Sequence, residues 1–291
     1  MPAAQPSRQF SLKQFVEELR SDIARNKIRL PTLPNISLEA LVVVNDDTST
    51  VADVAEIVEK DAAIASRLVK YANSPLYRGV KPVTTIKAAI TRIGFDKVRH
   101  AILTLAMKEV FKTGYRPLQK RMEELWEHSM DVATRAALLA RDFEHIDQEE
   151  ALLAGLVHDI GAIPVLLKAQ DYEMLVNSRK NLDKLIAPLH AAIGRDILRA
   201  WKFDPRLVAV ANEHENLSRD PGNAPVDLVD LVQVANVLSH ADSDHPLASV
   251  RYQDIPAFRR VNWQPPPPEG GEEHREDDAF QDIEELKDIL I

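Results

Sequence analysis

Two adjacent ionisable residues, His158 and Asp159, lie within an otherwise apolar stretch of the chain. The stretch reads Ala154-Gly-Leu-Val-His-Asp-Ile-Gly161, and further apolar residues flank it on both sides. This pattern is typical of a helix buried in a core. An ionisable side chain in such a place costs several kcal/mol unless it is paired, hydrogen-bonded or bound to a metal. The pair therefore requires partners from elsewhere in the chain.

Three further histidines could supply these partners. His128 precedes the pair, and His190 and His214 follow it, each on a segment with a helical pattern of apolar residues. Imidazole and carboxylate groups together suit Mn, Fe, Ni or Zn. Taken singly, each histidine is more often a surface residue, or a core residue paired with a neighbouring aspartate. Taken together, their number and order predict that they converge on one metal-binding cavity.

The elements that must position these residues read as helices throughout. Glycine is scarce, with 9 in 291 residues, and strand-like alternation is rare, so we predict an all-α fold. Pro117 marks the start of a long helix that carries His128, and a short connection at 142–147 returns the chain against the His158 helix. Pro164 is expected to kink or end that second helix. Other helix starts are predicted at capping residues: Ser11 with Gln14, Thr50, Asp61, Thr85, Asp147 with Glu150, and Asp204.

The net charge of −9 is unevenly distributed along the chain. From Gln264 to Ile291 there are ten acidic residues against Arg275 and Lys287, which gives −8 and leaves the remaining residues near −1. The body therefore lacks the basic excess of a domain that binds duplex nucleic acid. Beyond a Pro/Gly-rich linker, the sequence predicts an acidic amphipathic helix with one apolar face formed by Phe280, Ile283, Leu286 and Leu290.

Composition also bears on the compartment and on partners. The absence of cysteine fits a reducing cytosol, and we expect neither a secretory signal nor a segment long enough to span a membrane. The sequence thus favours a cytoplasmic protein. One stretch of the chain is rich in basic residues: Arg67, Lys70, Arg78, Lys81, Lys87 and Arg92. Such a stretch is more often a solvated helix face than a binding site for an acidic partner or a nucleotide, so these residues are weaker candidates.

Six segments resemble, in order, the HDOD domain, an HD-related output domain of bacterial signalling proteins. They are Leu30-Pro-Thr-Leu-Pro34, Tyr71-Ala-Asn-Ser-Pro-Leu-Tyr77, Ile86-Lys-Ala-Ala-Ile-Thr-Arg-Ile-Gly94, Trp126-Glu-His-Ser129, the His-Asp stretch at 154–161, and His190-Ala-Ala-Ile-Gly194. The resemblance implies a helical HDOD fold over residues 25–245, with an N-terminal helical subdomain at 25–114 and an HD-like helical bundle at 115–245. A helix within 1–24 would precede it, and a linker at 246–271 and the tail helix at 272–291 would follow.

The resemblance also implies a metal site, in a degenerate form. Its members would be His128, His158, Asp159, His190, His214 and Asn236. Active HD phosphohydrolases have an aspartate where this chain has Asn236, and an amide oxygen binds a divalent cation more weakly. The HD-GYP group, which cleaves cyclic dinucleotides, has a lysine where this chain has Ala162, and no Gly-Tyr-Pro motif follows His214. Loss of both charged groups removes stabilisation of a scissile phosphate.

These departures predict a regulatory signal-transduction protein that acts through protein–protein contacts, and no residue is assigned a catalytic role. The site could hold a divalent metal (Mn, Fe, Ni, Zn or Mg), and the expected partners are signalling proteins, with a nucleotide or cyclic dinucleotide as a possible ligand. One alternative is a metal-dependent phosphohydrolase acting on a nucleotide, a cyclic dinucleotide or a phosphomonoester. Another is a nucleotide sensor that binds its ligand without cleaving it.

Overall fold

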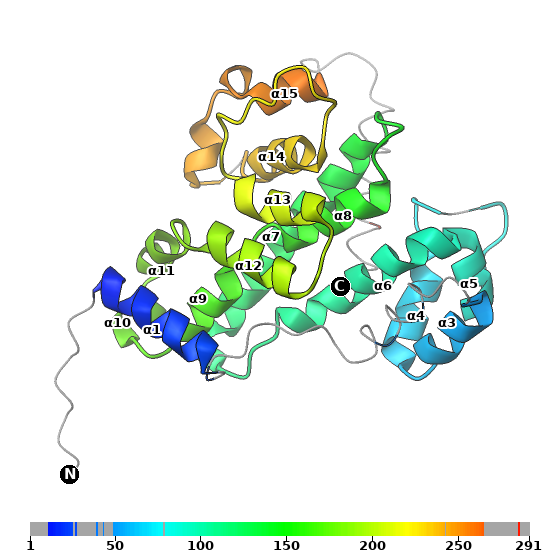
Figure 1. Cartoon of the computed structure of the whole chain (residues 1–291), viewed down its shortest axis with the longest axis horizontal. Helices are drawn as coiled ribbons and strands as arrows, with labels where there is room; N and C mark the ends of the chain where they lie inside the picture. Colours follow the sequence, from blue (N-terminus) through cyan, green and yellow to red (C-terminus); the bar gives the residue numbers. More distant parts are fainter. Residues whose placement is uncertain are drawn as a thin grey trace, which may run out of the picture.

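The computed structural model describes residues 11–25, 27, 39, 43, 49–77, 79–241, 243–264 and 285, and these contain helices and no strand. The predicted all-α fold is confirmed. Figure 1 shows the helices in chain order, with two short 3-10 turns at Pro246–Ser249 and Tyr252–Asp254. The α-helices are α1 Leu12–Ala24, α3 Val51–Val58, α4 Ala62–Tyr71, α5 Ile86–Ile93, α6 Phe95–Val110, α7 Arg116–Ala140, α8 Gln148–Val157, α9 Ala162–Ala169, α10 Glu173–Val176, α11 Arg179–Ile186, α12 His190–Ala200, α13 Pro205–Glu213, α14 Leu228–Ser239 and α15 Pro256–Val261.

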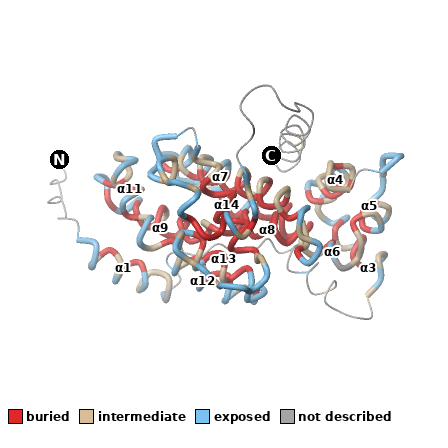
Figure 2. Tube along the Cα trace, turned by 90° about the horizontal axis from the view of Figure 1, so that it is seen from above, coloured by how far each residue is buried: buried red, intermediate tan, exposed pale blue. Residues whose placement is uncertain are grey.

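The molecule is elongated, with α3, α4 and α5 at one end and α1, α10 and α11 at the other (Figure 1). Helix α6 joins the first end to the centre, because it packs on α4 and α5 as well as on α8. At the centre, α7 packs on both α8 and α14, and Figure 2 shows that buried residues concentrate on these helices. The centre therefore provides rigid elements on which a functional site can be built.

Several predicted helix caps are present. Thr50 forms a full capping box with Asp53, and Asp61, Thr85 and Asp204 each accept hydrogen bonds from the first turn of their helix. The capping box predicted at Ser11 is wrong, since the Ser11 side chain caps nothing and the Gln14 amide donates to Glu18.

The capping box predicted before α8 is only half formed. Asp147 accepts hydrogen bonds from the backbone N–H groups of Glu149 and Glu150, as expected. In a full capping box the Glu150 carboxylate would accept a hydrogen bond from the backbone N–H of Asp147. Here it forms an ion pair with Arg206 on α13 instead, at 2.9 Å, so a tertiary contact replaces the local bond.

The break in the His-Asp segment lies before the expected position. Helix α8 ends at Val157, residues 158–161 form a turn, and α9 begins at Ala162. Pro164 occupies the first turn of α9, where its missing N–H costs nothing. The His158–Asp159 pair therefore sits on a turn between two helices rather than inside one helix.

Two glycines allow the close contacts that bring the site together. A Cβ atom on Gly155 of α8 would lie 2.3 Å from Ala133 Cα on α7, so only glycine permits α7 and α8 to approach this closely. A Cβ atom on Gly161 would lie 2.0 Å from the carbonyl oxygen of His190. Gly155 thus sets the distance between α7, which carries His128, and α8, which leads into the His158–Asp159 turn, and Gly161 sets the distance between that turn and α12.

The central helices also bear on the expectation of no membrane span. The stretch Gln148–Ala169 is long and apolar enough to cross a membrane by length and composition, so the sequence-based statement that no segment qualifies is wrong. Within the molecule, however, 89% of the most apolar 18-residue part of this stretch is buried. Such burial is the environment of a core helix, and one such stretch is weak evidence for a span.

The region beyond the bundle departs from the predicted linker. Residues 246–263 include the two 3-10 turns and α15, which packs on α14 and buries Phe258. This part of the predicted linker at 246–271 is therefore folded onto the body. The predicted tail helix at 272–291, Glu285 apart, and the Leu30–Pro34 motif lie outside the described residues.

Candidate metal centre

Four histidines surround the carboxylate of Asp159. The shortest distances run from Asp159 Oδ1 to His214 Nε2, 3.1 Å, and to His190 Nε2, 3.3 Å. Asp159 Oδ2 lies 3.6 Å from His158 Nε2 and 3.8 Å from His128 Nε2. These residues come from α7, the α8–α9 turn, α12 and the end of α13. The structure therefore brings together five of the six predicted site residues, and the interpretation of His128 and His190 as helix-surface residues is not supported.

Backbone carbonyl groups fix the orientation of three of the rings. His158 Nδ1 lies 2.6 Å from Gly155 O, His190 Nδ1 lies 3.0 Å from Ile186 O, and His214 Nδ1 lies 3.1 Å from Val210 O. A ring nitrogen that faces a carbonyl oxygen must carry a proton and donate it. In the neutral ring, Nε2 is then left with a free lone pair directed toward Asp159. Protein groups that orient histidine in this way are the usual supports of metal ligands.

Two of the free lone pairs face each other at short range, since His190 Nε2 and His214 Nε2 are 3.1 Å apart. Two acceptors at such a distance repel unless a proton or a cation lies between them. His158 Nε2 and His128 Nε2 are 3.3 Å apart, and a neutral His128 can donate from Nε2 to the lone pair of His158. The His190–His214 pair therefore requires a proton or a cation beside Asp159.

The pKa values show how this requirement is met in the absence of a metal. Burial lowers the pKa of His158 to about 3, so this ring is neutral. Burial also opposes the charged form of His214, but the hydrogen bond to Asp159 and the negative charge of Asp159 outweigh it and raise the pKa of His214 above 6.5. Burial alone would raise the pKa of Asp159, yet the neighbouring His158 and His190 and the bond from His214 hold it well below its usual range. Asp159 is thus a carboxylate, and its hydrogen bond and negative charge favour a proton on His214.

The donor atoms fall into two sets that share Asp159. One set is His128, His158 and Asp159, and the other is Asp159, His190 and His214, with the donor atoms of each set within 4.8 Å of one another. Nitrogen and carboxylate donors of this kind fit a first-row divalent ion. A carboxylate shared between two donor sets can bridge two ions. The donor chemistry therefore fits one or two divalent metals.

Asn236, the sixth predicted residue, is placed less directly. It lies on α14 and is 3% exposed, and its side-chain oxygen has no hydrogen-bond partner among the described residues. The contact between α14 and the cluster is made by Ser239, whose Oγ lies 3.5 Å from His128 Nδ1. An unsatisfied buried amide oxygen is costly unless it has a ligand. The role of Asn236 as a metal ligand remains a prediction.

The cavity contains residues that the sequence analysis did not identify. A cavity of about 430 Å³ opens onto Asp159 and is lined in part by Glu215, His240 and His245. The Glu215 carboxylate lies 3.6 Å from His190 Nε2. His240 lies one helical turn beyond Asn236, and this i, i+4 spacing could have indicated it. No sequence pattern pointed to His245, because it comes from a loop.

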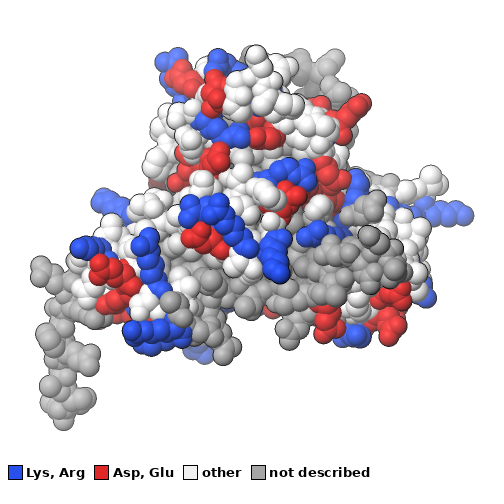
Figure 3. Space-filling model, in the orientation of Figure 1, with Lys and Arg blue, Asp and Glu red and all other residues white. Residues whose placement is uncertain are grey.

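Two residues of the predicted basic stretch have structural contacts, and a binding role for the stretch stays a prediction. The Arg92 guanidinium holds Ala72 O, Asn73 Oδ1 and Lys81 O and so supports a loop. Arg67 donates to Leu105 O, whereas Lys70, Lys81 and Lys87 are exposed, and Arg78 lies outside the described residues. Basic and acidic side chains are also interspersed on the face shown in Figure 3.

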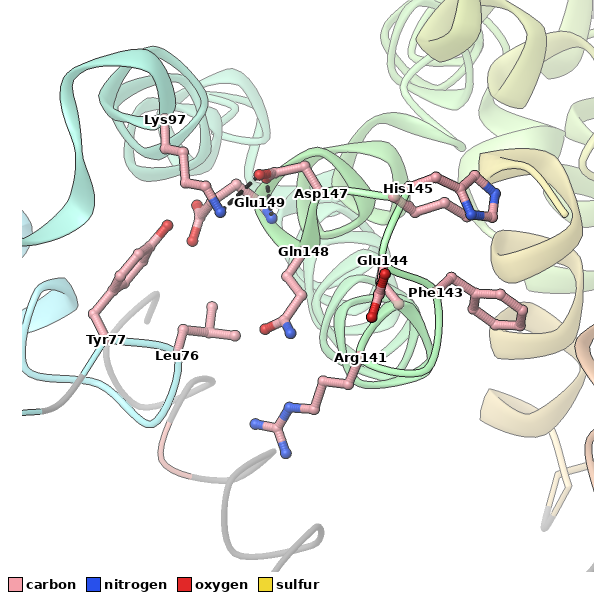
Figure 4. A pocket seen from close by; sticks show the side chains of 12 residues that line it. Leu76, Tyr77, Lys97, Arg141, Phe143, Glu144, His145, Asp147, Gln148 and Glu149 are labelled. Carbon is pink, nitrogen blue, oxygen red and sulfur yellow. Dashed lines mark hydrogen bonds and ion pairs between the residues drawn. The ribbon is translucent and has the colours of Figure 1, made fainter. Parts of the chain in front are cut away.

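A second cavity, of about 440 Å³, lies between α6 and the start of α8 (Figure 4). Lys97 forms an ion pair with Asp147 there at 2.8 Å. Behind it, the buried Tyr71 hydroxyl donates to Glu149 at 2.6 Å. Burial raises the pKa of Glu149 to about 7, against the lowering effect of the bond from Tyr71. This cluster joins the α3–α6 end of the molecule to the central helices.

Comparison with known families agrees with this architecture. The family profile of the HDOD domain matches residues 30–217. The chain belongs to the HDOD domain family. The HDOD match includes His128, the His158–Asp159 pair, His190 and His214, so these five residues lie within the matched segment.

Solved structures share the HDOD fold. A protein from Shewanella amazonensis SB2B, described as a candidate metal-dependent phosphohydrolase, is 27% identical, with a TM-score of 0.80 over 96% of this chain and 99% of its own. An HDOD domain protein of unknown function from Geobacter sulfurreducens is 23% identical, with a TM-score of 0.60 over 96% of this chain and 97% of its own. A candidate signal transduction protein from Marinobacter aquaeolei VT8 is 16% identical, with a TM-score of 0.59 over 98% of this chain and 67% of its own.

A curated relative, an uncharacterized protein from Treponema pallidum, is 22% identical over 264 residues, which are 86% of this chain and 49% of the relative. The chain thus spans about half the length of this relative.

Proposed function

We propose that this HDOD chain is a bacterial, cytoplasmic regulatory protein of signal transduction that binds divalent metal at Asp159 and acts on signalling partners through protein contacts. The observation that carries the metal assignment is the pair of inward-facing Nε2 atoms of His190 and His214 beside the Asp159 carboxylate, since their facing lone pairs require a proton or a cation. The similarity to a candidate signal transduction protein supports the regulatory role.

The surroundings of the centre argue against turnover of a polyanionic substrate. The cavity is lined by two guanidinium groups, those of Arg121 and Arg179, and by six carboxylates. Arg121 is paired with Glu124 and Asp183, and Arg179 is paired with Glu124. The excess charge is therefore negative, which disfavours a nucleotide or cyclic dinucleotide and favours a cation. The six carboxylates are Glu124, Glu127, Asp131, Asp159, Asp183 and Glu215.

Two further residues support the same conclusion. Ala162 stands next to the His-Asp turn, where the HD-GYP group has a lysine, and it is buried without a charge to offer. Asn236 brings a neutral amide in place of a carboxylate. Electrostatic stabilisation is the largest contribution in phosphoryl chemistry, so both replacements lower the expected rate severely.

Turnover assays on the metal-loaded protein test this proposal. We expect no hydrolysis of cyclic di-GMP, nucleoside phosphates or p-nitrophenyl phosphate above the level of the D159N variant. Steady turnover that D159N abolishes would replace the proposal with its alternative, a metal-dependent phosphohydrolase. That alternative draws support from the similarity to the candidate phosphohydrolase and from the intact donor residues. Stoichiometric nucleotide binding without cleavage would indicate a nucleotide sensor.

A further inference from the structure

Six histidine rings form a continuous series of contacts that extends the metal centre outward. His240 stacks on His128 with ring centroids 4.7 Å apart, and His245 stacks on His240 with centroids 3.9 Å apart and planes at 17°. Inward from His128, the series continues through His158 at 5.2 Å, then His214 at 4.9 Å, then His190 at 5.1 Å. Six of the nine histidines of the chain thus lie in one array.

The array runs from solvent to the buried centre. His245 is exposed and His240 is half-buried, whereas His158 and His214 are fully buried. His245, His240, His128 and Asp159 all line the same cavity. An ion that enters this cavity therefore has imidazole rings along its path.

The outer rings can offer donor atoms to a cation. Among the described residues, no hydrogen bond occupies either ring nitrogen of His240. His245 Nδ1 accepts one bond, from the backbone N–H of Leu247, and this bond is 3.3 Å long and exposed. Within the described part of the chain, coordination at His240 thus displaces no hydrogen bond, and coordination at His245 displaces one weak bond. Imidazole prefers borderline ions such as Zn²⁺, Ni²⁺ and Cu²⁺ to Mg²⁺ or Ca²⁺.

The charge around the cavity supports a cation rather than an anion as the occupant. Its six carboxylates exceed its two guanidinium groups by four, and Arg135, which is paired with Asp131, reduces this excess to three negative charges. A cavity with an excess of one sign of charge raises the local concentration of the opposite ion and its rate of association.

We propose that His240 and His245 form an outer capture site for a borderline divalent cation such as Zn²⁺, from which the ion passes by way of His128 to the centre at Asp159. The inference rests on the proposed metal centre. At each stage the ion exchanges bound water for imidazole nitrogen, and its oxidation state does not change. The outer site therefore controls the rate at which the centre is loaded rather than its affinity.

Stopped-flow measurement of Zn²⁺ uptake by the chelator-treated, full-length protein, with a zinc-indicator dye, tests the proposal. The main variant is H245N, because asparagine can still cap the turn at Leu247. H240N is the second variant. H145N is the matched control, since His145 is also an exposed histidine with one backbone contact, to Val226 O, but it lies outside the array.

We expect H245N and H240N to slow uptake about tenfold or more, the usual effect of removing a residue that supports a metal site, while H145N stays at the wild-type rate. For H245N, the affinity at equilibrium should be unchanged, so release into excess chelator should slow by the same factor. Uptake by H245N at the wild-type rate would overturn the capture site alone. A wild-type protein that takes up no stoichiometric Zn²⁺ would instead refute the proposed metal centre.

Discussion

His190 Nε2 and His214 Nε2 lie 3.1 Å apart, and each of these rings directs Nδ1 toward the carbonyl oxygen of the residue four positions earlier in the chain. Two nitrogen lone pairs cannot face each other at this distance without a cation or a proton between them. In the metal-free state, Asp159 raises the pKa of His214 and so favours a proton at this position. Metal and proton thus compete for the same place, and this competition leads to the first prediction.

Metal should stabilise the protein more at pH 8 than at pH 6. In the metal-free protein, the raised pKa of His214 contributes stability that is present below 6.5 and is lost as the pH rises through the higher folded value. Above that value a metal no longer has to displace the proton. A fixed Zn²⁺ concentration of about 100 times the Kd at pH 8 should then add about 3 kcal/mol to the free energy of unfolding at pH 8, and less at pH 6. Thermal unfolding with and without Zn²⁺ at both pH values measures this. Equal stabilisation of the wild type at pH 6 and pH 8 would contradict it.

Glu149→Gln should stabilise the protein at high pH. Burial raises the pKa of Glu149 from 4.5 to about 7, so the folded state holds this proton more tightly than the unfolded state. Stability therefore falls as the pH rises from 4.5 to about 7, by roughly 3 kcal/mol in total. Glutamine removes this loss and can still accept the bond from Tyr71.

Denaturant unfolding of wild type and E149Q at pH 5 and pH 8 measures the effect. The difference between the two proteins should be small at pH 5 and should favour E149Q at pH 8. The same difference at both pH values would show that the Glu149 carboxyl does not titrate in this range.

Gly155→Ala should weaken both the fold and the metal site. The added Cβ atom would lie 2.3 Å from Ala133 Cα, which forces α7 and α8 apart. Overpacking of this kind costs about 1–3 kcal/mol, and it moves His128 away from His158. Gly114→Ala is the matched control, because a Cβ atom there meets nothing within 4 Å. Chemical unfolding and Zn²⁺ titration of both variants test the prediction, which would be wrong if G155A matched G114A in both.

Asn236→Asp should increase metal affinity and lower the stability of the metal-free protein. Asn236 is 3% exposed, so an uncompensated carboxylate there costs several kcal/mol. If the side chain faces the centre, a bound cation offsets this cost and the affinity rises by about tenfold or more. Isothermal titration with Zn²⁺ measures whether the affinity of the variant exceeds that of the wild type. Lower stability without a gain in affinity would remove Asn236 from the ligand set.

The sequence predicted the main features of the site because they depend on residue order and helix patterns. Buried ionisable residues at His158 and Asp159 needed partners, and the histidines at 128, 190 and 214 are the ones the fold supplies. The helix break at 158–161 was missed, since Pro164 is the stronger local signal and Gly161 acts only through its contact with α12.

Tertiary contacts account for the remaining differences. Arg92 looked like part of a basic surface, but it holds a loop through backbone carbonyls that the sequence cannot place. His245 joins the array through a loop conformation rather than a helical period. The buried pair of Tyr71 and Glu149 joins residues 78 positions apart, beyond the reach of any local pattern.

Metal analysis of the purified wild type, D159N and D142N tests the central claim most directly. Asp142 is an exposed carboxylate outside the cluster, so D142N is the matched control. The account predicts about one metal ion or more per chain in wild type and in D142N, and a loss of about tenfold or more in D159N, as expected when a metal ligand is removed. Equal metal content in wild type and D159N, or a wild type that holds no metal after incubation with Zn²⁺, would contradict it.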